Sequence, residues 1–306
     1  MIARALAIGL AIEVAVYLWL GARLADTHGA PAAFATVVAI ALAWRAAIVL
    51  LTYAIAFLTP GHAEGVAAVG SLRMAAEVVR EIASYVALFA FAQPLARWTV
   101  GPPDGAHGPA GGEALLLVHG YLCNRGLWVS LVPKLAAAGY RVHTIDLEPG
   151  FGGIDGFAQQ LAARLEAVRR DAGGRPVALV GHSMGGLVIR ACLRDRGAEG
   201  VSRVVTLGSP HHGTSLAPFG LGRNAREMRR GSPWLAALAT AEGGSFPIPV
   251  TSIYSAQDNF ISPHRSSRLE GAANVELRGM GHLTMAFSGA LRRALLDALA
   301  RPRGAP

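Results

Sequence analysis

Two long apolar runs at the start of the chain give its first predicted elements. Residues 2–25 are apolar apart from three charged positions, and residues 32–58 carry a single charge, Arg45. Each run exceeds the ~20 residues that a helix needs to cross a bilayer. The pattern therefore predicts two membrane helices, the second ending at Thr59-Pro60-Gly61.

A cleaved signal peptide is the alternative reading of residues 1–22, because such peptides also begin with a charge and continue in an apolar stretch. Two features favour membrane spans instead. Glu13 interrupts the middle of the first run, and the second run is equally long.

Glu13 and Arg45 are the only charges deep inside the two runs. If residues 26–31 form the turn of an antiparallel hairpin, the centre of the turn falls near residue 29. Residue 13 lies 16 positions before that centre, and residue 45 lies 16 positions after it. At ~1.5 Å per residue the two side chains then sit at one depth. A charge in a membrane span usually finds a partner, so we expect these two to form an ion pair.

A third helical stretch, residues 71–98, does not by itself indicate whether it crosses the membrane. Its first half is polar, and its uncharged part from Ile82 to Ala96 is short and contains Pro94. It suits either a short third span or a helix lying in the interface. Residues 1–98 are thus predicted to be a membrane-anchoring helical region. Residues 99–112, rich in Gly, Pro and Ala, are predicted to be a linker.

The pattern changes at residue 113. Short apolar runs that predict strands now alternate with segments of helical periodicity, and a last helix is expected over residues 283–299. The predicted strands are residues 114–118, 140–147, 177–180, 201–207, 250–254 and 274–277. This alternation predicts an α/β fold for residues 113–300, with a mostly parallel sheet covered by helices on both faces.

The motif Gly181-His-Ser-Met-Gly185 follows the strand 177–180 and precedes the helix 184–194. A strand, a sharp turn and a helix push a serine hydroxyl out of the backbone, and glycines allow the strained turn to pack closely. The motif therefore predicts Ser183 as a nucleophile. His182 is expected to be a packed side chain that points away from the hydroxyl.

A serine hydroxyl needs a base, and in such folds the chain order is serine, acid, histidine. His282 follows the last predicted strand, at the carboxyl end of the sheet where catalytic groups collect, and is the predicted base. His211 and His212 are expected to be structural. Asp258 follows the strand 250–254 and is the predicted acid. Asp146 is the alternative acid, although it precedes the serine.

An oxyanion formed at Ser183 needs two N–H donors. One is predicted to be the backbone of Met184, the residue after the nucleophile. The other is predicted to be Tyr121, after the strand 114–118, where Gly120 lets the backbone approach. His119 is expected to order this loop.

Several of these motifs together resemble bacterial lipases and esterases of the α/β-hydrolase superfamily. They are Val118-His-Gly-Tyr121, Gly181-His-Ser-Met-Gly-Gly186, Leu207-Gly-Ser-Pro-His-His-Gly-Thr214, the segment Asp258–Pro263, and Gly281-His282. The resemblance implies a carboxylic ester hydrolase with the triad Ser183, Asp258 and His282. It implies no cofactor. No metal is expected either, because residues 283–288 lack the acidic ligands of the calcium-dependent members. An acyltransferase with the same triad and a non-catalytic membrane scaffold remain alternatives.

The segment 212–247 mixes apolar side chains such as Phe219 and Trp234 with four arginines. An insertion here would cap the site, so it is predicted to be a lid-like element facing lipid, with an ordinary solvated helix as the alternative.

Composition fits a membrane protein better than a nucleic-acid-binding one. Only 16% of residues are charged, against roughly 25% in average domains, and the net charge of +8 comes from scattered arginines without a long basic run. The predicted partners are therefore a lipid or other ester substrate and the membrane, not nucleic acid. The predicted location is a bacterial-type inner membrane, in a multi-pass arrangement. The membrane face, the acyl chain length and the oligomeric state stay open.

Overall fold

The computed structural model describes residues 2–62 and 70–301. A seven-stranded sheet forms its centre, in the order β1-β3-β2-β4-β5-β6-β7. The strands are β1 (Ala106–His107), β2 (Ala114–Val118), β3 (Arg141–Ile145), β4 (Val177–His182), β5 (Val201–Leu207), β6 (Val250–Ser255) and β7 (Ala273–Leu277). All neighbouring strands are parallel except β1, which pairs antiparallel with β3. The predicted α/β sheet is confirmed.

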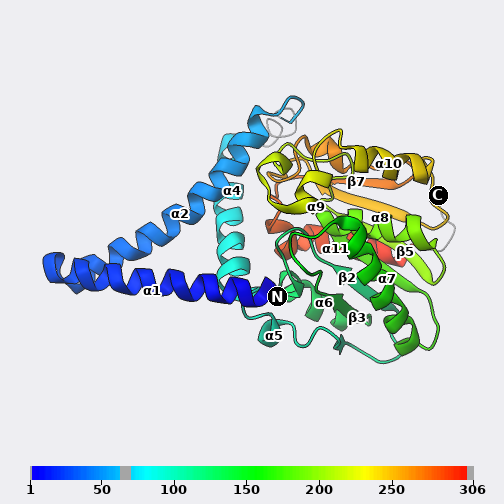
Figure 1. The fold of residues 1–306 in the computed structure, drawn as a ribbon, viewed down its shortest axis with the longest axis horizontal. Helices are drawn as coiled ribbons and strands as arrows, with labels where there is room; N and C mark the ends of the chain where they lie inside the picture. The colour runs from blue at the N-terminus through cyan, green and yellow to red at the C-terminus, as the bar shows by residue number, and fades with distance from the viewer. Residues whose placement is uncertain (1, 63–69, 302–306) are drawn as a thin grey trace.

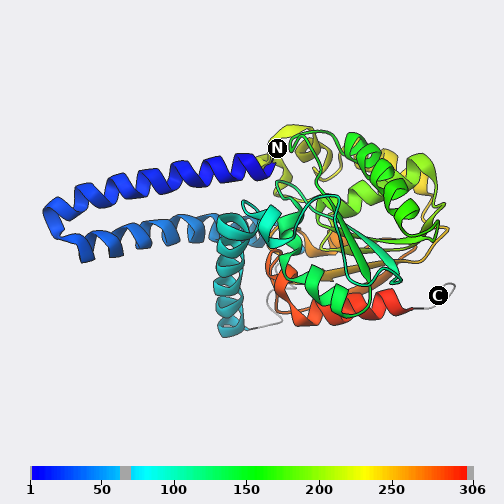
Figure 2. The same ribbon diagram turned by 90° about the horizontal axis from the view of Figure 1, so that it is seen from below.

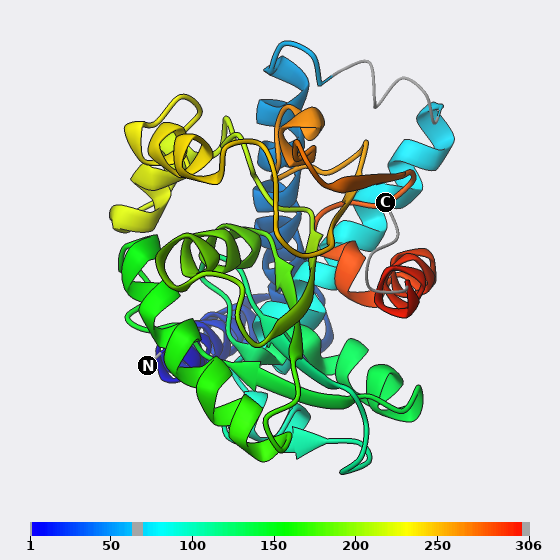
Figure 3. The same ribbon diagram turned by 90° about the vertical axis from the view of Figure 1, so that its right-hand side faces the viewer.

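Helices cover both faces of the sheet (Figure 3). On one face α7 (Ile154–Asp171) and α8 (Met184–Arg196) bury Leu116 and Leu179; on the other, α6 (Leu131–Ala137) and α11 (Gly289–Ala300) bury Leu115 and Val180. Consecutive strand residues point to opposite faces, so a strand buried on both faces is apolar throughout. This is why the strands read as continuous apolar runs in the sequence.

Two boundaries differ from the sequence-based prediction, and two short elements were not predicted. The predicted linker 99–112 contains β1 and so belongs partly to the sheet. The closing helix α11 begins at Gly289, not at residue 283, because Ser288 caps it by accepting a hydrogen bond from the Leu291 N–H; a 3₁₀ turn, η5 (Thr284–Phe287), precedes it. The sequence also did not predict α6 or the 3₁₀ turn η2 (Arg125–Val129).

The two predicted membrane helices form a hairpin that projects from the body (Figures 1 and 2). They are α1 (Ile2–His28) and α2 (Ala30–Leu58). Among the described residues these two are the only helices long and apolar enough to cross a membrane. No α1 residue is buried, and large apolar side chains such as Trp19 and Trp44 are exposed.

The predicted pairing of Glu13 with Arg45 is confirmed. The guanidinium of Arg45 donates to both carboxylate oxygens of Glu13, at 2.7 and 2.8 Å, and the Tyr17 hydroxyl donates to the same carboxylate at 2.6 Å. A bidentate pair fixes the register of α1 against α2 as well as neutralising the two charges.

The third helical stretch packs against the body of the molecule that contains the sheet (Figures 1 and 2). It consists of α4 (Ser71–Val86) and a short π-helix, η1 (Ala87–Ala92). Glu77, Glu81 and Ser84 of α4 are buried. Its polar face therefore meets protein and not lipid headgroups, and among the described residues α4 is not one of the helices long and apolar enough to cross a membrane.

Candidate active site

Ser183 occupies a sharp turn between β4 and α8. Its φ of 56° and ψ of −128° lie in a region that non-glycine residues rarely adopt. A Cβ at Gly181 would lie 2.7 Å from the Gly185 carbonyl carbon, and one at Gly185 would overlap the Val118 carbonyl oxygen. Glycine is thus required at both positions for the turn to pack against the sheet. The arrangement is the strand, turn and helix expected around an exposed nucleophile.

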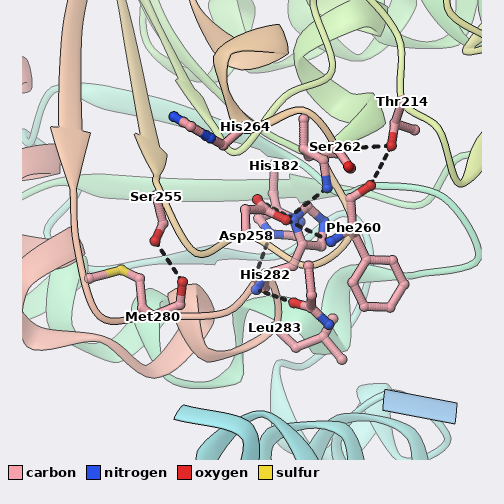
Figure 4. Close-up of polar contacts among 12 residues, drawn as sticks. His182, Thr214, Ser255, Asp258, Phe260, Ser262, His264, Met280, His282 and Leu283 are labelled. Carbon is pink, nitrogen blue, oxygen red and sulfur yellow. Dashed lines mark hydrogen bonds and ion pairs between the residues drawn. The ribbon is translucent and has the colours of Figure 1, made fainter. Parts of the chain in front are cut away.

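Asp258 and His282 meet at the carboxyl end of the sheet (Figure 4). His282 Nδ1 lies 2.8 Å from Asp258 Oδ2, and both side chains are buried. The other carboxylate oxygen of Asp258 accepts the N–H groups of Phe260 and Ile261, each at 2.9 Å. Three hydrogen bonds, including the one from the imidazole of His282, therefore fix the orientation of the Asp258 carboxylate.

The imidazole of His282 lies beside the nucleophile turn. Its ring centroid is 4.6 Å from that of His182, the residue that precedes Ser183, and His182 Nε2 lies 3.3 Å from the His282 carbonyl oxygen. Phe260 covers the imidazole, with ring centroids 5.1 Å apart. His182 itself is buried, so it packs below the site as the sequence predicted.

The charge on His282 is set by opposing influences. Burial disfavours the imidazolium, but the Asp258 carboxylate, its hydrogen bond and the charge of Glu81 together outweigh burial and raise the pKa of His282. A base that gains a proton readily, next to a serine, suits general-base chemistry near neutral pH.

The predicted oxyanion donors lie on either side of Ser183. Met184 is the first residue of α8, whose N-terminal N–H groups have no partner inside the helix. Tyr121 follows Gly120, where a Cβ would lie 2.8 Å from the Ser183 Cβ. Within residues 2–62 and 70–301, neither N–H donates a backbone hydrogen bond outside a helix or strand.

Other histidines and acids that competed in the sequence have structural partners. His119 accepts the Leu147 N–H at 3.0 Å and its Nδ1 lies 2.9 Å from the Gly120 carbonyl oxygen, so it orders the loop as expected. His211 lies 3.0 Å from the Thr206 hydroxyl and is buried. Asp146 pairs with Arg125 through the guanidinium and the backbone N–H. The alternative acid is therefore already engaged.

Side chains from the N-terminal helices hold the His282 loop, which the sequence did not predict. Glu81 of α4 is fully buried and accepts three hydrogen bonds: from the N–H of Leu283 at 2.8 Å, and from the N–H and hydroxyl of Thr284 at 2.9 and 2.7 Å. A carboxylate without a cation beside it is costly to bury, and these donors offset part of that cost.

A second connection runs from α2 to His282. The Thr52 hydroxyl accepts a hydrogen bond from Asn259 Nδ2 at 2.7 Å, and Asn259 Oδ1 accepts the His282 N–H at 3.0 Å. In the sequence, only the polar character of these two residues signalled the contacts: Thr52 stands in the apolar α2, and Glu81 is on the polar face of α4. Nothing in the sequence named their partners.

An apolar cavity of about 430 Å³ adjoins Ser183. The first part of the predicted lid-like insertion lines it, through residues such as Leu216, Phe219 and Met228. The second part, α10 (Pro233–Glu242), packs away from the cavity on α8, where the buried Arg190 forms an ion pair with the half-buried Glu242. In residues 2–62 and 70–301, no group of three His, Cys, Asp or Glu side chains is arranged to hold a metal ion.

Comparison with known proteins agrees with the fold. The family described as the alpha/beta hydrolase fold matches residues 113–237. A triacylglycerol lipase of Pseudarthrobacter phenanthrenivorans is 33% identical over 116 residues, 37% of this chain and 34% of the relative. A pimeloyl-[acyl-carrier protein] methyl ester esterase of Pectobacterium carotovorum is 36% identical over 101 residues, 33% of this chain and 38% of the relative. The chain thus spans little more than a third of the length of these relatives.

Solved lipase structures share the architecture. The mature lipase BlEst2 of Bacillus licheniformis superposes with a TM-score of 0.56 at 20% identity, covering 65% of this chain and 99% of that one. Lipase B of Aspergillus fumigatus superposes with a TM-score of 0.58 at 19% identity, covering 64% of this chain and 56% of that one. The chain therefore carries an α/β-hydrolase domain that resembles those of bacterial lipases and esterases.

Proposed function

We propose that the chain is a membrane-anchored hydrolase that cleaves carboxylic esters of lipid character through Ser183, His282 and Asp258. The observation that carries the proposal is the 2.8 Å hydrogen bond between Asp258 and His282 beside the strained turn of Ser183. The likeness to triacylglycerol lipases and methyl ester esterases supports the choice of carboxylic esters.

In this mechanism the Ser183 hydroxyl attacks the ester carbonyl while His282 Nε2 takes the hydroxyl proton. The tetrahedral oxyanion accepts hydrogen bonds from the N–H groups of Met184 and Tyr121. His282 then gives the proton to the departing alcohol, which leaves an acyl-enzyme on Ser183. Water, deprotonated by the same imidazole, releases the carboxylic acid.

Asp258 has a separate role. Its carboxylate accepts the Nδ1–H of His282, so that Nε2 presents its lone pair to the serine. It also stabilises the imidazolium that forms when His282 holds the proton. The N–H groups of Phe260 and Ile261 hold the carboxylate in this alignment.

The direct test is covalent labelling of the purified full chain with a fluorophosphonate, which reacts with activated serines. We expect the label on Ser183, together with release of acid from a soluble short-chain ester. Product analysis with added glycerol separates water from an alcohol as the acyl acceptor. An unlabelled Ser183 in folded protein would exclude the proposal.

Glu81 provides a further prediction, because its carboxyl group lies close to His282. Burial raises the pKa of Glu81, while the hydrogen bonds from Leu283 and Thr284 favour its ionised form, and the prediction applies to that ionised form. A negative charge raises the pKa of the imidazole, so the inactive protonated form persists to higher pH. In Glu81→Gln that charge is absent, and we expect the acidic limb of the kcat/KM profile to move to lower pH. A purely structural role would lower the rate at every pH and leave the limb in place.

We propose that α1 and α2 cross the membrane as the anchor of this enzyme. The Arg4 end of α1 lies beside the hydrolase domain, where the Ile2 N–H donates to Glu148, and the turn near residue 29 is the far tip of the hairpin (Figure 2). Positive charge favours the cytoplasmic side. The domain then faces the cytoplasm of a bacterial-type inner membrane.

This arrangement predicts opposite labelling of two introduced cysteines. His28→Cys at the tip should react with a membrane-impermeant maleimide in spheroplasts, and Asp104→Cys on the exposed domain surface only in inverted vesicles. The native Cys123 and Cys192 are buried and give a low background. Labelling of both positions from one side would contradict the two spans.

A further inference from the structure

One wall of the cavity beside Ser183 comes from α2, the second candidate span. Ile48, Leu51, Thr52 and Ile55 line the cavity. These positions follow helical spacing of three and four residues, so they form a single face of α2. The Thr52 hydroxyl already donates to the Val49 carbonyl and accepts from Asn259, so this face offers the cavity no unsatisfied polar group.

The rest of the lining is also uncharged. It comes from Tyr121 after β2, from the turn of Ser183, from the loop of Phe260 and Ile261, and from the segment after β5. No Asp, Glu, Lys or Arg lines the cavity in the described part of the chain. A wall without charges suits a hydrocarbon chain and provides nothing to select a phosphate or a carboxylate.

The mouth of the cavity lies between α2 and the insertion. Leu51 and Phe219 line the cavity and are nevertheless 60% and 72% exposed, so they mark its rim. Leu221, next to Phe219 in the insertion, is 69% exposed. On α2 the apolar exposure continues from Leu51 to Leu50 and Trp44 towards the hairpin tip. The rim is therefore continuous with the surface that would face lipid.

We infer that the acyl chain of an ester lipid enters this cavity laterally from the same bilayer that holds α1 and α2, with the α2 face of Ile48, Leu51 and Ile55 as its guide. The inference rests on the proposed function and names the substrate class: a lipid ester resident in the membrane. A chain that passes along α2 stays in apolar surroundings from the bilayer to Ser183 and avoids the cost of exposing each methylene to water.

The first experiment narrows the cavity from the α2 side. In Ile48→Trp and Ile55→Trp, the ratio of kcat/KM for a dodecanoyl ester to that for an acetyl ester should fall by at least about tenfold, because a bulky ring occupies the space of the longer chain. Leu50→Trp is the matched control. It lies on the same helix, is 53% exposed and does not line the cavity, so its ratio should match the unaltered protein.

Ile55→Ala covers the case in which a tryptophan prevents folding. A wider cavity should shift the preference towards longer or branched acyl chains. Chain-length profiles that stay unchanged in the alanine and tryptophan variants would overturn the inference. Absence of Ser183 labelling, or of all ester hydrolysis, in the unaltered protein would instead overturn the proposed function.

The second experiment tests the route. The full chain is reconstituted in phosphatidylcholine vesicles with a long-chain diacylglycerol either in the same bilayer or in separate protein-free vesicles. We expect hydrolysis to be at least about tenfold faster when enzyme and substrate share a bilayer. Equal initial rates would show that the ester arrives through water, and would overturn lateral entry.

Discussion

Ser183→Ala and His282→Ala are each expected to lower kcat for ester hydrolysis by about 10⁴- to 10⁶-fold, because neither the nucleophile nor its base has a substitute. Asp258→Asn should lower kcat by about 10⁴-fold, since an amide favours the wrong tautomer of His282. The double and triple variants should be little slower than the worst single variant, because the three groups act as one unit. Initial rates on a soluble short-chain ester measure each effect.

Asp146→Asn is the matched control for Asp258→Asn. Asp146 also lies at the carboxyl end of a strand, but its carboxylate pairs with Arg125. We expect its turnover to stay within a few-fold of the unaltered protein. Circular dichroism and thermal unfolding establish that each variant is folded. If Asp146→Asn lost turnover and Asp258→Asn kept it, the assignment of the acid would be wrong.

Separating Glu13 from Arg45 is expected to have the largest effect on insertion of the protein. Glu13→Leu and Arg45→Leu each leave one charge unpaired within a span, which costs at least ~2.5 kcal/mol on insertion scales. The double variant removes both charges and should recover insertion and protein level. Quantitative immunoblotting of carbonate-washed membranes measures all three variants.

Tyr17→Phe serves as the control in that series, since it removes one hydrogen bond to Glu13 and leaves both charges paired. Its protein level should stay close to that of the unaltered chain. If the losses of protein level in the two single variants added up in the double variant, the two charges would act separately. The proposed role of the ion pair in anchoring would then be wrong.

The sequence predicted most of the hydrolase domain because its signals are local. Apolar runs gave six of the seven strands close to their observed bounds, and the glycines around Ser183 identified the turn without any tertiary information. The strand β1 was missed because it has only two residues, and an alternating pattern of apolar and polar residues cannot be recognised over so short a segment.

The supports of the His282 loop were missed for a different reason. Glu81 meets Thr284 across a separation of 203 residues, and Thr52 meets Asn259 across 207. No periodicity connects positions so far apart. The polar face of α4 was visible in the sequence, but such a face suits lipid headgroups and a protein interior equally, and only the fold shows that it is covered by the hydrolase domain.

The contacts of Glu81 and Thr52 connect the loop of His282, the proposed base, to the helices of the proposed membrane anchor. A cut that separated residues 99–301 from the N-terminal helices would leave the N–H groups of Leu283 and Thr284 without their acceptor, and Asn259 without its partner on α2. The cavity would lose a wall in the same cut. On the proposed function, we expect such a cut to lower ester hydrolysis, because the loop of the proposed base would lose its supports from α2 and α4 at once. Activity and anchoring would then be lost together, so that removal of the N-terminal helices would also silence the site.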